Sequence, residues 1–323
     1  MKRRTLLAGT AALAGTAGLP IAAQAQARAR GNVLRVGVTT FPPGGADPRR
    51  SVSVFATYTW SPMFEALTTF SEATELAPEL AVAWQATSPT TWHFKLREGA
   101  KFSTGRTLTA QDVADNLDWL RTPEAAGSPV QRQLESVTAA RAIDPLTVEV
   151  TTAYPNAILP REISCLYIVE PGLWRTLGPD GFARAPVGTG PFKLTDWGAA
   201  KIVYAPNPHS WRPPQLAGLE ILDLPEMTSR LQALVTGQID VAIGMGPDEQ
   251  PTIEQAGGRL HERSPHDVIS LAFVIGAGSR RAVNPLNDVR VRRALNHAVD
   301  KDTIASVILQ GRSRAATQGA VRG

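Results

Sequence analysis

The most reactive side chains in this sequence are one cysteine, Cys165, and five histidines at positions 93, 209, 261, 266 and 297. A lone cysteine forms neither an internal disulfide nor a zinc–thiolate cluster. The histidines lack both the four-residue spacing and the H-E-x-x-H context of a metalloenzyme helix. Cys165 has apolar neighbours, Ile163, Leu166 and Ile168, and such surroundings raise the pKa of a thiol and make it inert. We therefore expect no catalytic residue, no metal site and no cofactor.

An exported enzyme is the alternative hypothesis, because Cys165 could act as a nucleophile together with one of the histidines. No G-x-S-x-G, S-x-x-K or zinc-binding motif supports it. The Asp and Glu residues also show no spacing that singles out an acid–base pair. Rapid modification of Cys165 by a thiol reagent in the folded protein would favour the enzyme.

The amino terminus has the pattern of an export signal. Three basic residues at 2–4 precede an uncharged, Ala- and Gly-rich run over 5–23, which ends in overlapping Ala-x-Ala sites within 23–27. Its glycines and Pro20 argue against a membrane-spanning helix. We interpret 1–27 as a signal peptide and expect a periplasmic protein with no membrane insertion after cleavage. The RRTLL segment at 3–7 resembles the twin-arginine motif, so Sec and Tat export both stay open.

Removal of this segment changes the charge of the protein. Without the three basic residues at 2–4, the 33 Lys and Arg residues become 30, against 29 Asp and Glu, which gives a formal charge of +1. Nucleic-acid binding needs a basic excess that the mature chain lacks. The cluster Arg290, Arg292 and Arg293 is interpreted as the solvated face of a helix. We therefore expect no nucleic-acid partner and no strongly charged solute.

Hydrophobic patterning predicts the elements that must position any functional residue. A β-rich run over 33–38 is followed by a loop over 39–45 that contains two prolines and two glycines. Alternation of apolar and polar residues over 92–97 predicts a half-buried strand. Asp144-Pro145 predicts a hairpin turn. The strands on either side of this turn are expected at 139–142 and 147–151.

Further elements alternate along the chain. TAQD at 109–112 predicts a capping box, after which Val113, Leu117 and Leu120 share one face of a helix. Other helices are expected over 52–67, 226–236, 248–256, 288–298 and 301–310, and other strands near 201–205, 219–224, 239–243 and 268–275. Strands mixed with helices in this way indicate an α/β or mixed α+β fold.

Four sequence motifs, here called blocks, follow one another along the chain in a characteristic order. They are LAVAW at 80–84, WHFKLREGAKF followed by Gly105 and LTAQDV within 92–113, VGTGPF at 187–192, and DVRVRRALNHAVD at 288–300. Together they resemble the family 5 extracellular solute-binding proteins, the dipeptide, oligopeptide and nickel class that feeds ABC importers. The resemblance extends over about 31–323. Each block also has a fold-forming role, such as the close backbone approach that Gly188 and Gly190 permit.

The resemblance implies a two-lobed clamp of the type II periplasmic-binding-protein class. Because family members are considerably longer, we expect a nearly complete first lobe over 28–275, followed over 276–323 by the hinge and the start of a second lobe that is mostly missing. Whether the chain is a fragment or a natural truncation stays open, and a non-functional truncated fragment of a binding protein is a further alternative. The apolar sides of the last two helices would then have nothing to cover them; these sides carry Val289, Leu295, Ile304 and Ile308.

The same resemblance implies a substrate-binding component of an ABC transporter, which closes on a small solute by hinge motion and delivers it to permease and ATPase subunits. We expect a monomer and, as first choice of ligand, a di- or oligopeptide; nickel chelates, sugars and opines are further cargoes of similar proteins. The predicted ligand contacts are Thr40 and Phe41, in the loop after the first strand, and Tyr167. Tyr167 lies in a run over 164–169 that aligns with a cleft-facing strand of the family. Phe41 and Tyr167 have simple packing roles as alternatives.

A transcription regulator that uses the same sensing domain is a third possibility. It would need an N-terminal DNA-binding helix-turn-helix and a cytoplasmic location. The first 30 residues have the pattern of a signal instead, which excludes this class.

Overall fold

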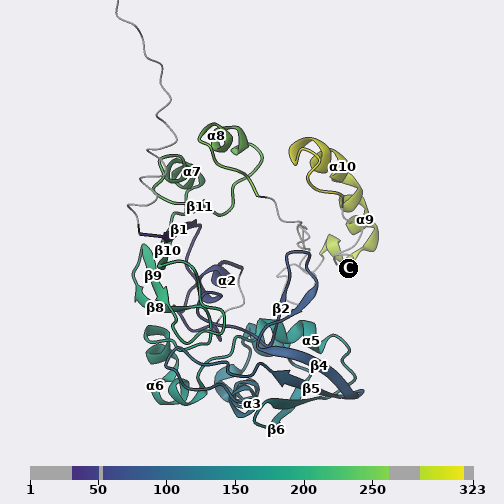
Figure 1. The fold of residues 1–323 in the computed structure, drawn as a ribbon. Helices are drawn as coiled ribbons and strands as arrows, with labels where there is room; N and C mark the ends of the chain where they lie inside the picture. The colour runs from purple at the N-terminus through teal and green to yellow at the C-terminus, as the bar shows by residue number, and fades with distance from the viewer. Residues whose placement is uncertain (1–30, 51–53, 262–283, 316–323) are drawn as a thin grey trace, which may run out of the picture. The chain divides into compact units, whose positions relative to one another are not determined.

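The computed structural model describes residues 31–50, 54–261 and 284–315. The chain divides into two compact units, Met1–Gly244 and Met245–Gly323, and each is described by itself (Figure 1). The predicted signal over 1–27, the predicted strand over 268–275 and the predicted lobe boundary after residue 275 lie outside the described residues.

The first unit contains a five-stranded sheet built from β1 (Val33–Val38), β8 (Phe192–Trp197), β9 (Lys201–Pro206), β10 (Gly218–Asp223) and β11 (Val241–Ala242). Its strand order is β11-β1-β10-β9-β8. β1 is parallel to both β10 and β11, whereas β9 is antiparallel to both β10 and β8. It follows that β1, β8, β10 and β11 all run in the same direction.

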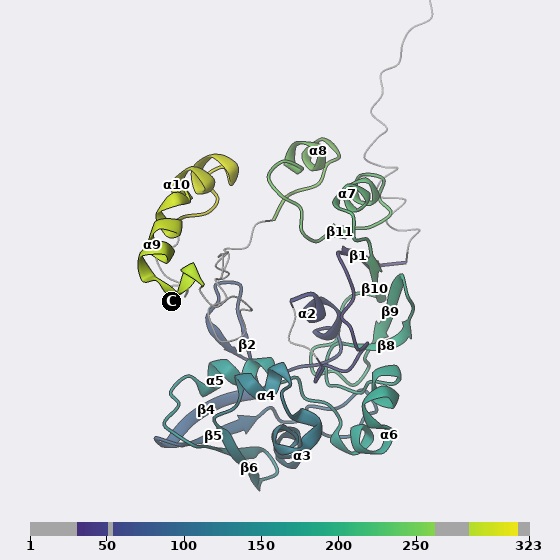
Figure 2. The same cartoon turned by 180° about the vertical axis from the view of Figure 1, so that it is seen from behind.

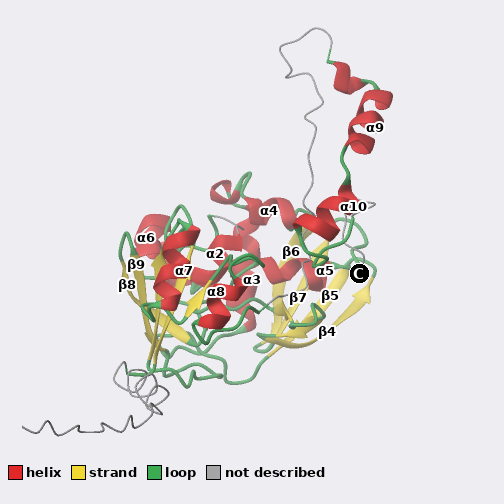
Figure 3. Cartoon of the chain, turned by 90° about the horizontal axis from the view of Figure 1, so that it is seen from above, coloured by secondary structure: helices red, strands yellow, loops and turns green. Residues whose placement is uncertain are grey.

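A second sheet has the order β4-β5-β7-β6 and is antiparallel throughout. Its strands are β4 (Ala81–Ser88), β5 (Thr91–Leu96), β6 (Val137–Asp144) and β7 (Thr147–Thr152), and a small separate ribbon pairs β2 (Thr68–Phe70) with β3 (Leu76–Pro78). Phe94 and Leu96 are buried while Lys95 is exposed, which confirms the predicted alternation. The hairpin is also confirmed, and Asp144 Oδ1 accepts the Leu146 N–H at 2.7 Å within its turn. Figure 3 shows the two sheets as separate groups of strands.

The helical segments of this unit connect and cover the sheets. They are α2 (Val54–Trp60), α3 (Ala110–Asp118), η1 (Trp119–Arg121), η2 (Pro123–Ala125), α4 (Pro129–Gln133), α5 (Leu159–Glu162), η3 (Ile163–Cys165), α6 (Pro171–Arg184) and α7 (Met227–Val235). The capping box of α3 is confirmed, since Thr109 and Asp112 bond each other's backbone N–H. Val113 and Leu117 are buried as predicted, and α3 lies beside β6 (Figure 2). Leu120 is buried as well, but it belongs to η1 because α3 ends before it.

The predicted helix over 52–67 is shorter than expected. Within the described residues α2 ends at Trp60, because Pro62 has no N–H with which to continue the helical ladder. The carbonyl oxygens of Pro62 and Met63 instead accept the N–H groups of Phe192 and Gly190, each at 2.9 Å. A Cβ on Gly190 would lie 2.6 Å from the Pro62 oxygen, so the close backbone approach expected of VGTGPF is confirmed.

The second unit consists of short helices, namely α8 (Gln250–Gln255), η4 (Pro285–Asn287), α9 (Val289–Ala298), α10 (Lys301–Thr303) and the π-turn η5 (Ile304–Ile308). The expected exposure of apolar side chains is confirmed at 46% for Val289, 40% for Leu295, 39% for Ile304 and 67% for Ile308. Arg290 and Arg293 are exposed as predicted, but Arg292 is half-buried and donates to the Leu286 oxygen at 2.7 Å. Among the described residues no helix has both the length and the apolar character needed to cross a membrane.

Candidate functional site

The carboxyl ends of β1, β8, β10 and β11 lie at one edge of the five-stranded sheet, because these strands run in the same direction. Ligands of open α/β sheets bind outside the carboxyl ends of the strands. Two buried polar atoms at this edge, Thr39 Oγ1 and Asp223 Oδ1, have no hydrogen-bond partner among the described residues. This edge is therefore a candidate ligand-facing surface of the first unit.

One buried guanidinium fixes the positions of two of these strand ends. Arg230 of α7 is only 3% exposed. Its Nη1 donates to the oxygens of Leu224 and Pro225, at 2.5 and 2.8 Å, and its Nε donates to the Ile243 oxygen at 3.0 Å. These carbonyls follow β10 and β11 directly. Sequence reasoning missed Arg230, although it is the single charged residue of the predicted helix beyond Glu226.

The predicted contacts Thr40 and Phe41 follow β1 at this edge, as expected. Thr40 is exposed, and its Oγ1 donates to the Phe41 oxygen at 3.3 Å. The Phe41 ring is half-buried and packs edge-on against Trp197 at the end of β8, with the ring centroids 6.1 Å apart. Phe41 therefore has a packing partner, and a ligand-binding role for either residue stays a prediction.

Tyr167 lies in a segment that is not a strand. The predicted strand over 164–169 is wrong: the chain forms η3 and then an irregular stretch. The N–H groups there bond to loop and side-chain acceptors, such as the Glu65 oxygen for Ile168 and Asn116 Oδ1 for Val169. No strand among the described residues provides the acceptors for these N–H groups. The irregular stretch therefore has no place in a strand ladder.

The Tyr167 side chain contacts residues at and after the end of α2. Its hydroxyl lies 3.0 Å from Ser61 Oγ, and the ring packs on Phe64 at a centroid distance of 6.4 Å. Burial raises the pKa of the Tyr167 phenol. The end of α2 links this position to the loop after β1, because Trp60 Nε1 donates to the Gly45 oxygen at 3.1 Å while the adjacent Ser61 contacts Tyr167. Tyr167 and Phe41 thus pack on different aromatic residues.

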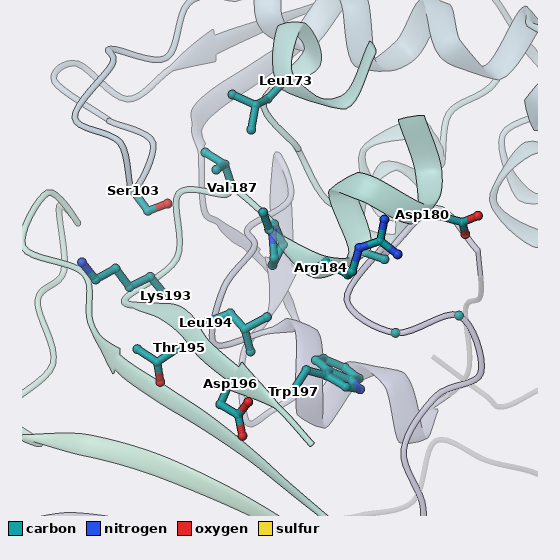
Figure 4. A pocket seen from close by; sticks show the side chains of 15 residues that line it. Ser103, Leu173, Asp180, Arg184, Val187, Lys193, Leu194, Thr195, Asp196 and Trp197 are labelled. Atoms are coloured by element: carbon teal, nitrogen blue, oxygen red, sulfur yellow. The ribbon is translucent and has the colours of Figure 1, made fainter. Parts of the chain in front are cut away.

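A pocket of about 780 Å³ opens beside β8 (Figure 4). Its walls are residues 193–197 of β8, the end of α6 with the following residues to Val187, the turn at Gly44 and Gly45, and the side chains of Ser103 and Leu173. Trp197 joins the pocket to the sheet edge, since it lines the pocket and touches Phe41. None of the three predicted contacts lines the pocket itself. The sequence carried no signal for it, because its walls come from segments far apart in the chain.

The charged residues of the pocket differ in their pairing. Asp180 bonds Arg50 at 2.5 Å, and this partner lowers the pKa of Asp180, with a smaller contribution from the neighbouring Arg184. Lys193 and Asp196 are both exposed, and neither forms an ion pair within the described residues. Arg184 also lines the pocket and is exposed, and it has no ion pair within the described residues, so the pocket offers two positive groups and one negative group that are not already neutralised.

Cys165 has the properties expected of an unreactive thiol. Burial raises its pKa to about 12, so the thiolate is scarce at neutral pH. Within the described ranges no three side chains of the His, Cys, Asp and Glu types gather as a metal site.

The fold and the strand edge define a lobe of the type II periplasmic-binding-protein class. The structure of OppA from Burkholderia pseudomallei matches with a TM-score of 0.69 and 26% identity, covering 86% of this chain and 58% of that one. The family described as bacterial extracellular solute-binding proteins, family 5 (middle), matches residues 75–321, and the chain belongs to this family. The resemblance and the fold class inferred from the sequence are thereby confirmed.

Two curated relatives illustrate the extent of the match. Protein XP55 of Streptomyces lividans is 30% identical over 262 residues, which is 79% of this chain and 47% of the relative. The glutathione-binding protein GsiB of Escherichia coli K12 is 26% identical over 234 residues, which is 70% of this chain and 44% of GsiB. The chain spans about half the length of the curated relatives it matches.

Proposed function

We propose that this chain is the periplasmic substrate-binding component of an ABC importer, and that its solute is a di- or oligopeptide. The observation that carries the proposal is the carboxyl edge of the five-stranded sheet, where Thr40 and Phe41 follow β1 and where the buried Thr39 Oγ1 and Asp223 Oδ1 have no hydrogen-bond partner among the described residues. The relative GsiB is described as binding glutathione, which is itself a tripeptide.

In this proposal the first unit supplies one wall of the binding site, and Thr40, Phe41 and Tyr167 contact the solute. The captured solute is then delivered to permease and ATPase subunits. The proposal includes export by the segment 1–27 and a monomeric binding protein.

The experiment is to recover the native protein from the periplasm of its host, measure its intact mass, and identify by mass spectrometry the small molecules released on denaturation. We expect a protein cleaved near residue 27 and a peptide in the released fraction. Recovery from the cytoplasm, or a released solute that is not a peptide, would contradict the proposal.

The three contacts are tested separately with trialanine as the probe. The double variant Phe41→Ala/Tyr167→Ala is expected to bind it roughly tenfold more weakly or worse, because two apolar contact surfaces are lost. Phe70→Ala is the matched control, since Phe70 is a half-buried aromatic residue of the β2–β3 ribbon. Unchanged affinity in the double variant would remove Phe41 and Tyr167 from the site.

A further inference from the structure

Arg49 is a buried cation in the loop between β1 and α2. The residue is only 4% exposed. Its Nη2 donates to Asn116 Oδ1 at 2.8 Å, and the guanidinium forms no ion pair in the described part of the chain. A buried charge is costly unless a charged partner and hydrogen bonds compensate it. Among the described residues, the side-chain partner of this cation is thus a neutral amide.

The buried carboxylate of Asp47, two residues earlier, has other partners. Its Oδ1 accepts the backbone N–H of Arg49 at 3.1 Å, and its Oδ2 accepts the Trp174 Nε1–H at 3.3 Å. The ion pair of Asp47 is with Arg50, whose Nε lies at 3.6 Å. Burial lowers the pKa of Arg49 to about 9; Asp47 opposes this shift, and Arg175 adds to it. Asp47 therefore offsets the charge of the Arg49 guanidinium only in part.

Two tryptophan rings contact the same guanidinium. The ring centroids of Trp119 and Trp174 lie 4.7 and 4.4 Å from Arg49 Cζ, and the two rings meet edge to face. A cation–π contact stabilises the charge, but it supplies no lone pair for the N–H groups. The rings belong to η1 and α6, so Arg49 lies where these two elements meet the loop after β1.

Two N–H donors at this place lack an acceptor. They are Arg49 Nε and Trp119 Nε1, both buried atoms without a hydrogen-bond partner among the described residues. Trp119 is 6% exposed, and its ring is in contact with the guanidinium. Buried donors are almost always satisfied in native proteins, if not by the chain then by a water or an ion. An anion would satisfy the donors and also compensate the charge, whereas a water would leave the charge as it is.

We propose that Arg49 and Trp119 bind a chloride ion inside the first unit. The ion accepts the N–H groups of Arg49 Nε and Trp119 Nε1. A larger oxyanion would bring further oxygens that need donors of their own, which favours a monatomic anion. By holding Arg49 and Trp119 together, the ion joins the loop after β1 to the end of α3. This role is structural and does not depend on the solute of the proposed function.

The test follows unfolding of the full chain in urea at neutral pH, while sodium gluconate is replaced by sodium chloride at constant ionic strength. An ion bound with a Kd of about 10 mM raises the folding equilibrium constant about tenfold between about 1 and about 100 mM chloride. We expect a response of this size in the wild type. Trp119→Phe keeps an aromatic ring beside the cation but removes the indole N–H, so its response should fall to about twofold or less.

Trp92→Phe is the matched control, because Trp92 Nε1 already has an acceptor, the Asn156 oxygen at 3.0 Å. This variant should keep the tenfold response even if it is less stable, and the comparison removes the general effect of the two salts on unfolding. A crystal grown with bromide gives a second readout, an anomalous peak beside Arg49 Nε and Trp119 Nε1.

Three results would overturn the chloride site. They are a wild type that does not respond to chloride, a Trp119→Phe response equal to that of Trp92→Phe, and an ordered water in place of the anomalous peak. None of them bears on the proposed function, because none involves the solute.

Discussion

Arg212 joins two carboxylates inside the first unit. Its Nε donates to Glu65 Oε1 at 2.7 Å, and its Nη2 donates to Glu79 Oε1 at 3.0 Å. Glu65 is fully buried and Glu79 nearly so. Burial first, and the neighbouring Glu65 second, raise the pKa of Glu79 to about 7, although Arg212 opposes this shift. One guanidinium therefore pairs with two carboxyl groups, and Glu79 keeps its proton to a higher pH than an ordinary glutamate does.

This arrangement predicts a pH dependence of stability. The folded state binds the Glu79 proton more tightly than the unfolded state, so the free energy of unfolding should fall as the pH rises from about 4.5 to about 7, by at most on the order of 3 kcal/mol. Glu79→Gln should remove this part of the dependence in urea unfolding series at pH 5, 6, 7 and 8. Glu72→Gln, at an exposed position, is the control. A Glu79→Gln profile parallel to that of the wild type would show that Glu79 ionises normally.

Gly190 is a second residue whose surroundings decide its role. A Cβ there would lie 2.6 Å from the Pro62 oxygen and 2.6 Å from the Met63 carbonyl carbon, so the backbone itself would have to move. We expect Gly190→Ala to lower the free energy of unfolding by roughly 1–3 kcal/mol. Gly218→Ala is the control, because its Cβ would meet its nearest atoms at an ordinary distance of 3.4 Å. Equal stability of the two variants in chemical unfolding would contradict the close approach.

At the scale of elements, α3 depends on its first turn. Thr109 and Asp112 satisfy each other's backbone N–H groups, and Asp112 also accepts two N–H donors of Arg106, at 2.8 and 3.1 Å. Thr109→Ala should therefore destabilise the protein by about 1 kcal/mol, the usual cost of losing a cap. Thr107→Ala, at an exposed loop position nearby, should change little. Thermal unfolding of the two variants compares them directly, and an unaltered Tm for Thr109→Ala would mean that Asp112 alone holds the helix end.

At the scale of the whole molecule, the two units differ in how much they bury. Nearly all of the described core belongs to the first unit, whereas in the second unit Ile253 and Ala305 are the buried apolar residues of the described ranges. Helical amides without a packed face open easily. We expect the amides of α9 to exchange with solvent much faster than those of α3 when the purified chain is followed by hydrogen-exchange mass spectrometry.

The same exchange experiment also tests whether the apolar side chains of α9 are covered in solution. If α9 exchanges as slowly as α3, another surface covers Val289 and Leu295. Dilution then separates the causes: protection that disappears on dilution comes from a second copy of the chain, whereas protection that persists contradicts the expected low stability of the unit.

Features that depend on residues close together in the chain could be predicted from the amino-acid sequence. The capping box at Thr109, the turn at Asp144 and the alternation of β5 were predictable because each follows from residues a few positions apart. The family was also readable, because its four blocks lie in order along the chain. The ligand contacts Thr40, Phe41 and Tyr167 remain predictions. The sequence gives the side-chain types of these three residues, but it does not give the residues that they contact in the folded chain.

The other features depend on contacts between segments that are distant in the chain. The irregular segment around Tyr167 has N–H partners in the Glu65 backbone oxygen and the Asn116 side chain, and the segment after α2 is held by the N–H groups of Gly190 and Phe192, which bond to the oxygens of Met63 and Pro62. The pocket beside β8 and the clamp made by Arg230 likewise join segments separated by long stretches of chain. Burial and hydrogen-bond satisfaction are properties of the folded whole, so a local pattern predicts which element forms but not which distant group completes it.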